Sequence, residues 1–231
     1  MNRERRAELD VWALIPARSL VTGKSRLAPI LDGAARHYLN ASLLQHTVAT
    51  AKAAFDASRV LVVSGCDEVR QAALQLGVET FRDHQQHGLN SALKQAAAEA
   101  SRRGADGVLV LPCDLPLVSA SDLNLLLGAV HRDGQMVISP DRTNSGTNAL
   151  LLSPVGAVDY SFGVGSFRRF LKQAHERHLP YRVVRSQGLS LDLDVPEDLS
   201  YWAELTRSSG ASRYEFSSDV LKALRAVHVG I

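Results

Sequence analysis

RVLVVSGCDEVRQAALQLGVETFRD, residues 59–83, predicts a strand, a helix and a second strand in direct succession. Residues 59–65 form a short apolar run rich in β-branched side chains, which is typical of a buried strand. Residues 67–77 have a helical pattern that ends at a glycine, and residues 78–83 are again strand-like. Two strands joined by a helix pair in parallel, so this segment indicates a parallel sheet with a helix packed on it.

The same alternation extends along most of the chain. Further strands are expected at residues 11–17 and within 106–118, and further helices at 34–55, 88–104 and 119–132. Ser119 and Asp122 have the spacing of a helix N-cap. Beyond residue 132 we expect one or two extra, antiparallel strands within 135–154, a turn and helix within 161–180, and an alternating segment and short helix within 181–205. The predicted fold is α/β, with a Rossmann-like, mostly parallel sheet sandwiched by helices.

The predicted single domain covers residues 11–205, with an N-terminal extension at 1–10 and a C-terminal linker and helix at 206–231. The net charge of +2 argues against general nucleic-acid binding. The chain has no run of about 18 apolar residues and no apolar segment at its start, so we expect no membrane span and no secretory signal. The two cysteines show no zinc or CxxC spacing, and the simplest expectation is a reduced, cytoplasmic protein.

Three aspartates form the first candidate site. Asp114 ends the strand expected within residues 106–118, and Asp192 and Asp194 are two residues apart in LSLDLDVPEDL. In a strand, residues i and i+2 share a face, so Asp192 and Asp194 are expected to point together. Clustered carboxylates repel one another unless a cation neutralises them, and oxygen ligands favour Mg²⁺. The alternative is that Asp114 lies at a turn and that Asp194 and Asp198 cap the last short helix.

A basic loop, PARSLVTGKSRLAPIL (residues 16–31), follows the first strand and contains Arg18, Lys24 and Arg26. A basic loop at the carboxyl end of a strand suits a polyphosphate. It is not a P-loop, because that motif needs a glycine at the position of Arg18. The alternative is a solvated basic loop without a ligand.

Two polar motifs, SGTNALLL and FGVGSFRRF, supply donors for an anion. Thr147 and Ser166 carry hydroxyl groups, and Gly163 lets a backbone N–H approach a ligand closely. Ser166 is expected where a helix begins, with Arg168 and Arg169 nearby, and a helix N-terminus favours anions. The alternative is that the glycines serve turns and that Ser166 caps the helix.

Asn90 is a candidate for recognition of a nucleobase. It lies near the start of the helix expected at residues 88–104. Its amide could pair with the edge of a base or cap the helix, and the residues alone favour the cap.

Taken in order, these segments resemble the CofC/FbiD family, the phosphocarboxylate guanylyltransferases of coenzyme F-420 biosynthesis. That family lies within the molybdenum-cofactor-guanylyltransferase-like nucleotidyltransferases. The resemblance runs from about residue 11 to 205 and rests on the motifs LIPARSLVTGKSRL, GLNSAL, LPCDLPL, ISPDR, GTNALLL, FGVGSF and LDLDVPEDL. It implies a fold of the nucleotide-diphospho-sugar transferase type. It also implies transfer of GMP from GTP to 2-phospho-L-lactate, phosphoenolpyruvate or 3-phospho-D-glycerate, with release of pyrophosphate.

The resemblance implies a role for individual residues as well. Catalytic roles fall on Lys24 and Asp114. Mg²⁺ is expected on Asp114, Asp192 and Asp194. The acid substrate is expected on Thr147, Gly163 and Ser166, and the nucleotide on Arg18, Lys24, Arg26, Leu89 and Asn90.

Two positions depart from the family, which usually has Lys in place of Arg18 and His in place of Phe170. The rival functions are a sister nucleotidyltransferase that loads a sugar phosphate or molybdopterin, a P-loop kinase, and a non-catalytic nucleotide sensor on the same fold. The sister enzymes usually have a glycine-rich first loop, and here the corresponding loop has only Gly23. The expected partners are GTP and a phosphorylated acid, and the residues leave open whether the protein is a homodimer.

Overall fold

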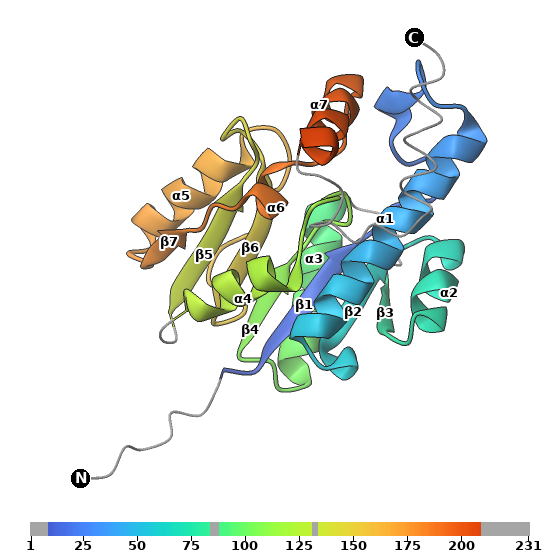
Figure 1. The fold of residues 1–231 in the computed structure, drawn as a ribbon. Helices are drawn as coiled ribbons and strands as arrows, with labels where there is room; N and C mark the ends of the chain where they lie inside the picture. The colour runs from blue at the N-terminus through green and yellow to red at the C-terminus, as the bar shows by residue number, and fades with distance from the viewer. Residues whose placement is uncertain (1–8, 84–87, 131–133, 209–231) are drawn as a thin grey trace.

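A seven-stranded mixed sheet forms the centre of the protein (Figure 1). The computed structural model describes residues 9–83, 88–130 and 134–208. The strand order is β3-β2-β1-β4-β6-β5-β7, in which only β6 runs antiparallel to its two neighbours, β4 and β5. The strands are β1 (Val11–Pro16), β2 (Val60–Ser64), β3 (Glu79–Arg82), β4 (Gly107–Val110), β5 (Gln135–Pro140), β6 (Thr147–Ser153) and β7 (Tyr181–Val183). The predicted mostly parallel α/β sheet is confirmed.

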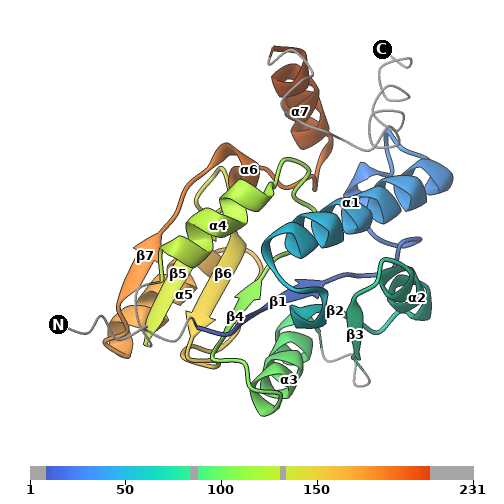
Figure 2. The same cartoon turned by 60° about the horizontal axis from the view of Figure 1, so that its bottom comes forward.

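Helices cover both faces of the sheet (Figure 2). The helices are α1 (Gly33–Ala54), α2 (Asp67–Gln75), α3 (Leu89–Arg102), α4 (Ala120–Gly128), α5 (Ser166–Glu176), α6 (Gln187–Ser190) and α7 (Pro196–Ser208), with short 3-10 turns η1 (Ser25–Leu27) and η2 (Ala57–Arg59). Along β1, Trp12 and Leu14 face α3 and α5, whereas Ala13 and Ile15 face α1 and α2. This alternation places a hydrophobic core on each side of the sheet. None of the helices in the described part of the chain has the length and apolar character that crossing a membrane requires.

A further apolar cluster lies beside the sheet and fixes the segment that carries two of the candidate aspartates. Leu191 and Leu193 are buried there, together with Leu199 and Trp202 of α7. The cluster also contains side chains from η1 and the first half of α1. Burial of the two leucines therefore fixes the position of Asp192 and Asp194 relative to the loop that precedes α1.

Several boundaries differ from the sequence-based expectations. β4 ends at Val110, so Asp114 does not end a strand but lies in the turn that follows. Residues 191–194 do not join the sheet, so the strand geometry used to orient Asp192 and Asp194 is not formed there. Helix α7 continues to Ser208, across the expected domain end at residue 205.

Three expected segments lie partly or wholly outside the described residues. They are residues 1–8 of the N-terminal extension, residues 131 and 132 of a helix, and residues 209–231 of the tail. Ser119 caps α4 with Asp122 in a capping box, as predicted.

Phe170, one of the two positions where the resemblance implies a different residue, is fully buried in the core between the sheet and α5. Its ring meets Phe162 edge-on, with the ring centroids 5.2 Å apart. We expect Phe170→His to lower the free energy of unfolding by about 1–3 kcal/mol, because a buried imidazole without a partner loses its hydrogen bonds to water. Urea denaturation measures this change. Unchanged stability together with an altered preference among acid substrates would contradict the placement of residue 170 in the core.

Candidate active site

One large cleft of about 1190 Å³ lies at the carboxyl ends of the parallel strands. Because β6 runs antiparallel, its first residues, Thr147 and Asn148, lie at the same edge as the last residues of β1 and β4. Ligands of open α/β sheets gather at this edge. The sequence-predicted site residues that line the cleft are Arg18, Lys24, Arg26, Leu89, Asp114, Thr147, Gly163, Ser166, Asp192 and Asp194. Asn90 is the one predicted residue that is not among its lining residues.

The basic loop makes a tight turn after the carboxyl end of β1. The backbone N–H of Gly23 donates to the carbonyl of Ser19 over 2.9 Å, and a Cβ at Gly23 would lie 2.8 Å from that same oxygen. Only glycine fits this approach. The next residue, Lys24, has a left-handed backbone (φ 54°), which costs free energy in a residue with a Cβ. This conformation turns the Lys24 side chain inward.

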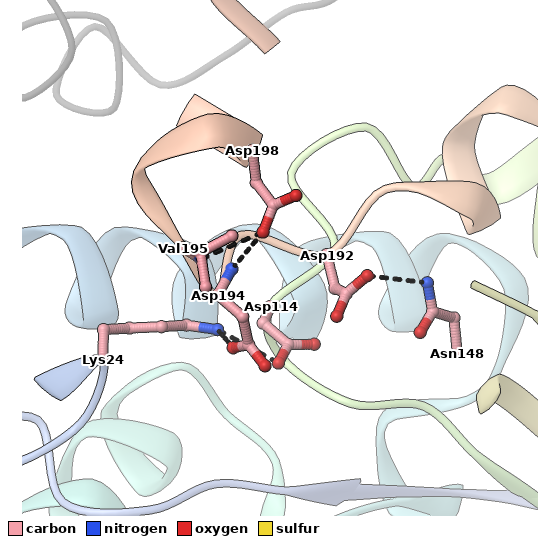
Figure 3. A network of polar contacts seen from close by, with 7 residues as sticks. All are labelled: Lys24, Asp114, Asn148, Asp192, Asp194, Val195 and Asp198. Atoms are coloured by element: carbon pink, nitrogen blue, oxygen red, sulfur yellow. Dashed lines mark hydrogen bonds and ion pairs between the residues drawn. The ribbon is translucent and has the colours of Figure 1, made fainter. Parts of the chain in front are cut away.

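Lys24 places its ammonium group between two of the candidate aspartates (Figure 3). Its Nζ lies 3.1 Å from Asp114 Oδ2 and 2.8 Å from Asp194 Oδ1, and its side chain is only 10% exposed. Burial opposes the charged form, but Asp114 and then Asp194 raise the pKa of Lys24 above its ordinary value. Lys24 is therefore a charged, buried group at neutral pH.

The carboxylate of Asp194 interacts with three basic side chains of the loop. Burial by itself would raise its pKa, but Lys24, followed by Arg26 and Arg18, lowers the pKa of Asp194 below its ordinary value. All three basic residues of the loop therefore act on one carboxylate. The backbone N–H groups of Asp194 and Val195 donate to Asp198 over 3.0 Å. Of the two predicted caps, Asp198 does cap the start of α7, whereas the Asp194 side chain faces Lys24.

The segment around Asp192 is joined to the turn after β4. The backbone N–H of Leu193 donates to the carbonyl oxygen of Asp114 over 3.1 Å. Leu191 and Leu193 are buried, and Asp192 and Asp194 point the other way into the cleft. The expected alternation is therefore present in an extended linker rather than in a strand.

Asp192 carries negative charge that its neighbours compensate poorly. Burial, followed by the charges of Asp114 and Asp194, raises the pKa of Asp192 to about 6. Its side-chain partner is Asn148 Nδ2, 3.4 Å from Oδ1 (Figure 3). The same amide donates to the carbonyl of Leu189 over 3.0 Å. Within the residues that the structure describes, no group of three or more His, Cys, Asp or Glu side chains is arranged closely enough to hold a metal ion. The all-oxygen donor set and the excess charge on Asp192 are nevertheless suited to a hard cation.

The opposite wall of the cleft carries hydroxyl groups. Ser166 Oγ donates to Thr147 Oγ1 over 3.0 Å, and both side chains are buried. Ser166 is the first residue of α5, as expected, and the N-cap is Gly165, so the alternative in which Ser166 caps this helix is wrong. Gly163 has φ 118° and faces the cleft with its backbone. Arg169 bonds the carbonyls of this turn instead of facing an anion.

Sequence reasoning missed Asp141, which shapes the loop between β5 and β6. Its carboxylate accepts the backbone N–H groups of Ser145 (2.9 Å) and Gly146 (2.7 Å), and the Thr143 hydroxyl as well. This loop borders the cleft beside Thr147. The signal was present, because an aspartate followed by Thr, Asn, Ser and Gly is typical of a turn held by its own side chain.

The side chain of Asn90 makes contacts that rule out one of its two sequence-based interpretations, the helix cap. The N-cap of α3 is Gly88, so Asn90 does not cap the helix. Its side chain instead bonds the backbone of Phe162, in the turn that precedes α5. Leu89, one residue earlier, does face the cleft.

Comparisons with known proteins agree with this architecture. The family described as "Guanylyl transferase CofC like" matches residues 11–225, which extends past the expected domain end at 205. A phosphoenolpyruvate guanylyltransferase of Rubrobacter xylanophilus is 41% identical over 202 residues, covering 87% of this chain and 96% of that protein. A 2-phospho-L-lactate guanylyltransferase of Methanothermobacter thermautotrophicus is 35% identical over 192 residues, covering 83% of each. A solved structure from Desulfovibrio desulfuricans G20, provisionally described as a nucleotide-diphospho-sugar transferase, has the same fold (TM-score 0.76, 15% identity, 96% of this chain and 98% of that one).

Proposed function

This chain belongs to the family of CofC-like guanylyl transferases, and on that basis we propose that it transfers GMP from GTP to a small phosphorylated carboxylic acid and releases pyrophosphate. The observation that carries the proposal is a single cleft with a basic loop and three carboxylates on one side and a hydroxyl-lined turn on the other. Phosphoenolpyruvate is the favoured acid, since the relative at 41% identity is named for it. Coenzyme F-420 biosynthesis is the proposed pathway.

The nucleotide occupies the half of the cleft formed by the basic loop and the start of α3. Arg18, Lys24 and Arg26 supply positive charge for the triphosphate, in agreement with their joint effect on Asp194. Leu89 offers an apolar contact to the base. The acid occupies the other half, where Thr147, Ser166 and the backbone of Gly163 provide donors for its phosphate or carboxylate.

The reaction needs charge neutralisation more than proton transfer. A phosphate oxygen of the acid attacks the α-phosphorus of GTP, and the bond to the β-phosphate breaks with pyrophosphate leaving in line. The attacking phosphate is already an anion, so no general base is required. Burial, followed by the charge of Asp114, raises the pKa of Cys113 to about 12, so this thiol in the cleft is not a nucleophile. Lys24 and the arginines stabilise charge that builds up on the leaving group.

Asp114, Asp192 and Asp194 are the residues proposed to hold Mg²⁺. The ion would supply Lewis-acid stabilisation of the phosphate oxygens and offset repulsion between the two anionic substrates. The residues fit this task because Asp192 has a raised pKa from burial and from two neighbouring carboxylates, which a cation relieves.

The experiment that tests this function measures pyrophosphate release by the purified protein with GTP and Mg²⁺. Phosphoenolpyruvate, 2-phospho-L-lactate and 3-phospho-D-glycerate are supplied one at a time, with ATP and CTP as nucleotide controls. We expect release with GTP and one acid, and phosphoenolpyruvate to be the most efficient. Release with CTP or ATP in place of GTP, or with none of the acids, would overturn the proposal.

Thr147→Val tests the acid half of the cleft. Thr147 Oγ1 already accepts a hydrogen bond from Ser166, so its own proton remains to be donated to a bound anion. Since a hydrogen bond to a charged group contributes about 1.5–3 kcal/mol, we expect KM for the acid to rise roughly 10-fold or more, with a smaller change in KM for GTP. Thr50→Val, which removes a buried hydroxyl on α1 outside the cleft, is the control. Equal effects on both substrates would contradict the assignment.

A further inference from the structure

The side chain of Asn90 pairs with both backbone polar groups of a single distant residue. The N–H of Phe162 donates to Asn90 Oδ1 over 2.7 Å, and Asn90 Nδ2 donates to the Phe162 carbonyl over 3.3 Å. The two residues are 72 positions apart in sequence. The first turn of α3 is thereby tied to the turn that precedes α5.

This turn is also held from its other side. Arg169 of α5 donates to the carbonyls of Ser161 and Val164, and Gln173 donates to the Ser161 hydroxyl over 3.2 Å. The Phe162 ring packs edge-on against Phe170 in the core. The residues around Gly163 are therefore positioned by contacts on both flanks.

The position of Gly163 follows directly from that of Phe162. Gly163 comes next in the chain, has a left-handed φ of 118°, and lines the cleft with its backbone. Rigid placement of a backbone donor is what an anion site needs, because a misplaced donor loses its hydrogen bond. Asn90 is thus the link between the start of α3, where Leu89 lines the nucleotide half, and the turn that lines the acid half.

The same contacts argue against direct recognition of the base. An amide recognises a nucleobase edge by offering one donor and one acceptor together. In Asn90 both are already engaged by Phe162, and Asn90 is not among the residues that line the cleft. A paired contact of this kind with a base would require these two hydrogen bonds to break, and the turn at Gly163 would lose its support from α3.

We propose that Asn90 is a positioning residue that sets the acid-binding turn at Gly163 through the backbone of Phe162 and does not select the base. The inference rests on the proposed division of the cleft into a nucleotide half and an acid half.

Asn90→Ala is the variant that tests this role. We expect KM for the acid to rise about 10-fold, while the Kd for GTP, measured by calorimetry without acid, and the preference for GTP over ATP stay within about 2-fold of wild type. Hydrogen exchange of the peptide that contains Phe162 and Gly163 should become faster, and this readout does not depend on turnover. Arg169→Ala, which releases the same turn from α5, should reproduce the pattern.

The outcomes test the role of Asn90 separately from the proposed guanylyl transfer. Weakened GTP binding or a relaxed preference for GTP over ATP in Asn90→Ala would show that the residue recognises the base, and would overturn the inference. Unchanged KM for the acid together with unchanged exchange would overturn it as well. Failure of the wild-type protein to release pyrophosphate with any acid would count against the proposed function instead, while the exchange and GTP-binding results would still decide whether Asn90 supports the turn. A large drop in the melting temperature of Asn90→Ala would move the decision to Arg169→Ala.

Discussion

Asp192→Asn is expected to lower turnover by at least about 100-fold and, at the same time, to raise the melting temperature of the metal-free protein. The loss of turnover follows from the loss of a charged stabiliser at the reacting phosphates, whose removal typically costs a factor of about 10²–10³. The amide has nearly the same shape, and its oxygen can still accept the hydrogen bond from Asn148. The change therefore removes charge with little effect on packing.

The stability gain follows from the sign of the pKa shift. In the folded protein the pKa of Asp192 is about 6, above its ordinary value of 3.8, because of burial and then of Asp114 and Asp194. The folded state therefore disfavours the ionised form, and this penalty is absent below about pH 3.8 and complete above about pH 6. At pH 7.5 in EDTA, removal of the charge should add up to about 3 kcal/mol, and each kcal/mol raises Tm by roughly 2–4 °C for a protein of this size.

Steady-state kinetics and thermal melting in EDTA measure the two effects. Asp56→Asn, at an exposed aspartate outside the cleft, is the matched control and should change neither. Wild-type turnover in Asp192→Asn would remove this residue from the proposed Mg²⁺ site. A fall in Tm would show that burial and the two neighbouring carboxylates do not destabilise the charged form of Asp192 in the folded protein.

Lys24→Met is expected to lower turnover by about 10²–10³-fold and to destabilise the metal-free protein. Methionine keeps the length and flexibility of the side chain but removes the ammonium that lies 3.1 Å from Asp114 and 2.8 Å from Asp194. The triphosphate loses a buried positive charge, and electrostatic stabilisation of the leaving group falls accordingly. The two carboxylates are left without the cation between them, which destabilises the fold.

The destabilisation should be larger in EDTA than in Mg²⁺, because a divalent cation can replace the missing positive charge among the carboxylates. Thermal melting under both conditions measures this difference. Lys172→Met removes an exposed lysine that pairs with Glu176 on α5, and it should leave turnover and Tm unchanged. Equal destabilisation with and without Mg²⁺ would contradict the proposal that Asp114 and Asp194 bind the ion.

Much of the cleft was predictable from local sequence patterns. Apolar runs and helical spacing marked the strands and helices, and the edge where parallel strands end marked the place of a ligand. That reasoning brought the basic loop, Asp114 and the loop before β6 to one edge, and the structure has them lining one cleft together with Asp192, Asp194 and Ser166. The predicted alternation of Leu191 and Leu193 with the two aspartates is also present in the structure. Burial of the leucines requires only an extended backbone, not a strand paired in the sheet.

The errors arose where a local pattern has more than one three-dimensional solution. Gly165 rather than Ser166 caps α5, because its left-handed backbone ends the turn there and leaves the Ser166 hydroxyl for Thr147. Asp114 lies beyond β4 rather than at its end, since the residues after Val110 leave the sheet before the carboxylate is reached. The interpretation of Asn90 as a cap rested on its position near a helix start, but Gly88 caps α3 and the Asn90 side chain bonds a turn near α5.

The sequence by itself determined the order of the elements, the faces they bury and the chemical types of side chain at the carboxyl edge, because each of these depends on residues that are neighbours along the chain. Only the tertiary structure decided which side chains meet. Lys24 reaches Asp114 across 90 residues and Asp194 across 170, and Asn90 reaches Phe162 across 72. Such contacts depend on how strands far apart in sequence are ordered and how α7 packs beside the sheet, and no local periodicity records that arrangement.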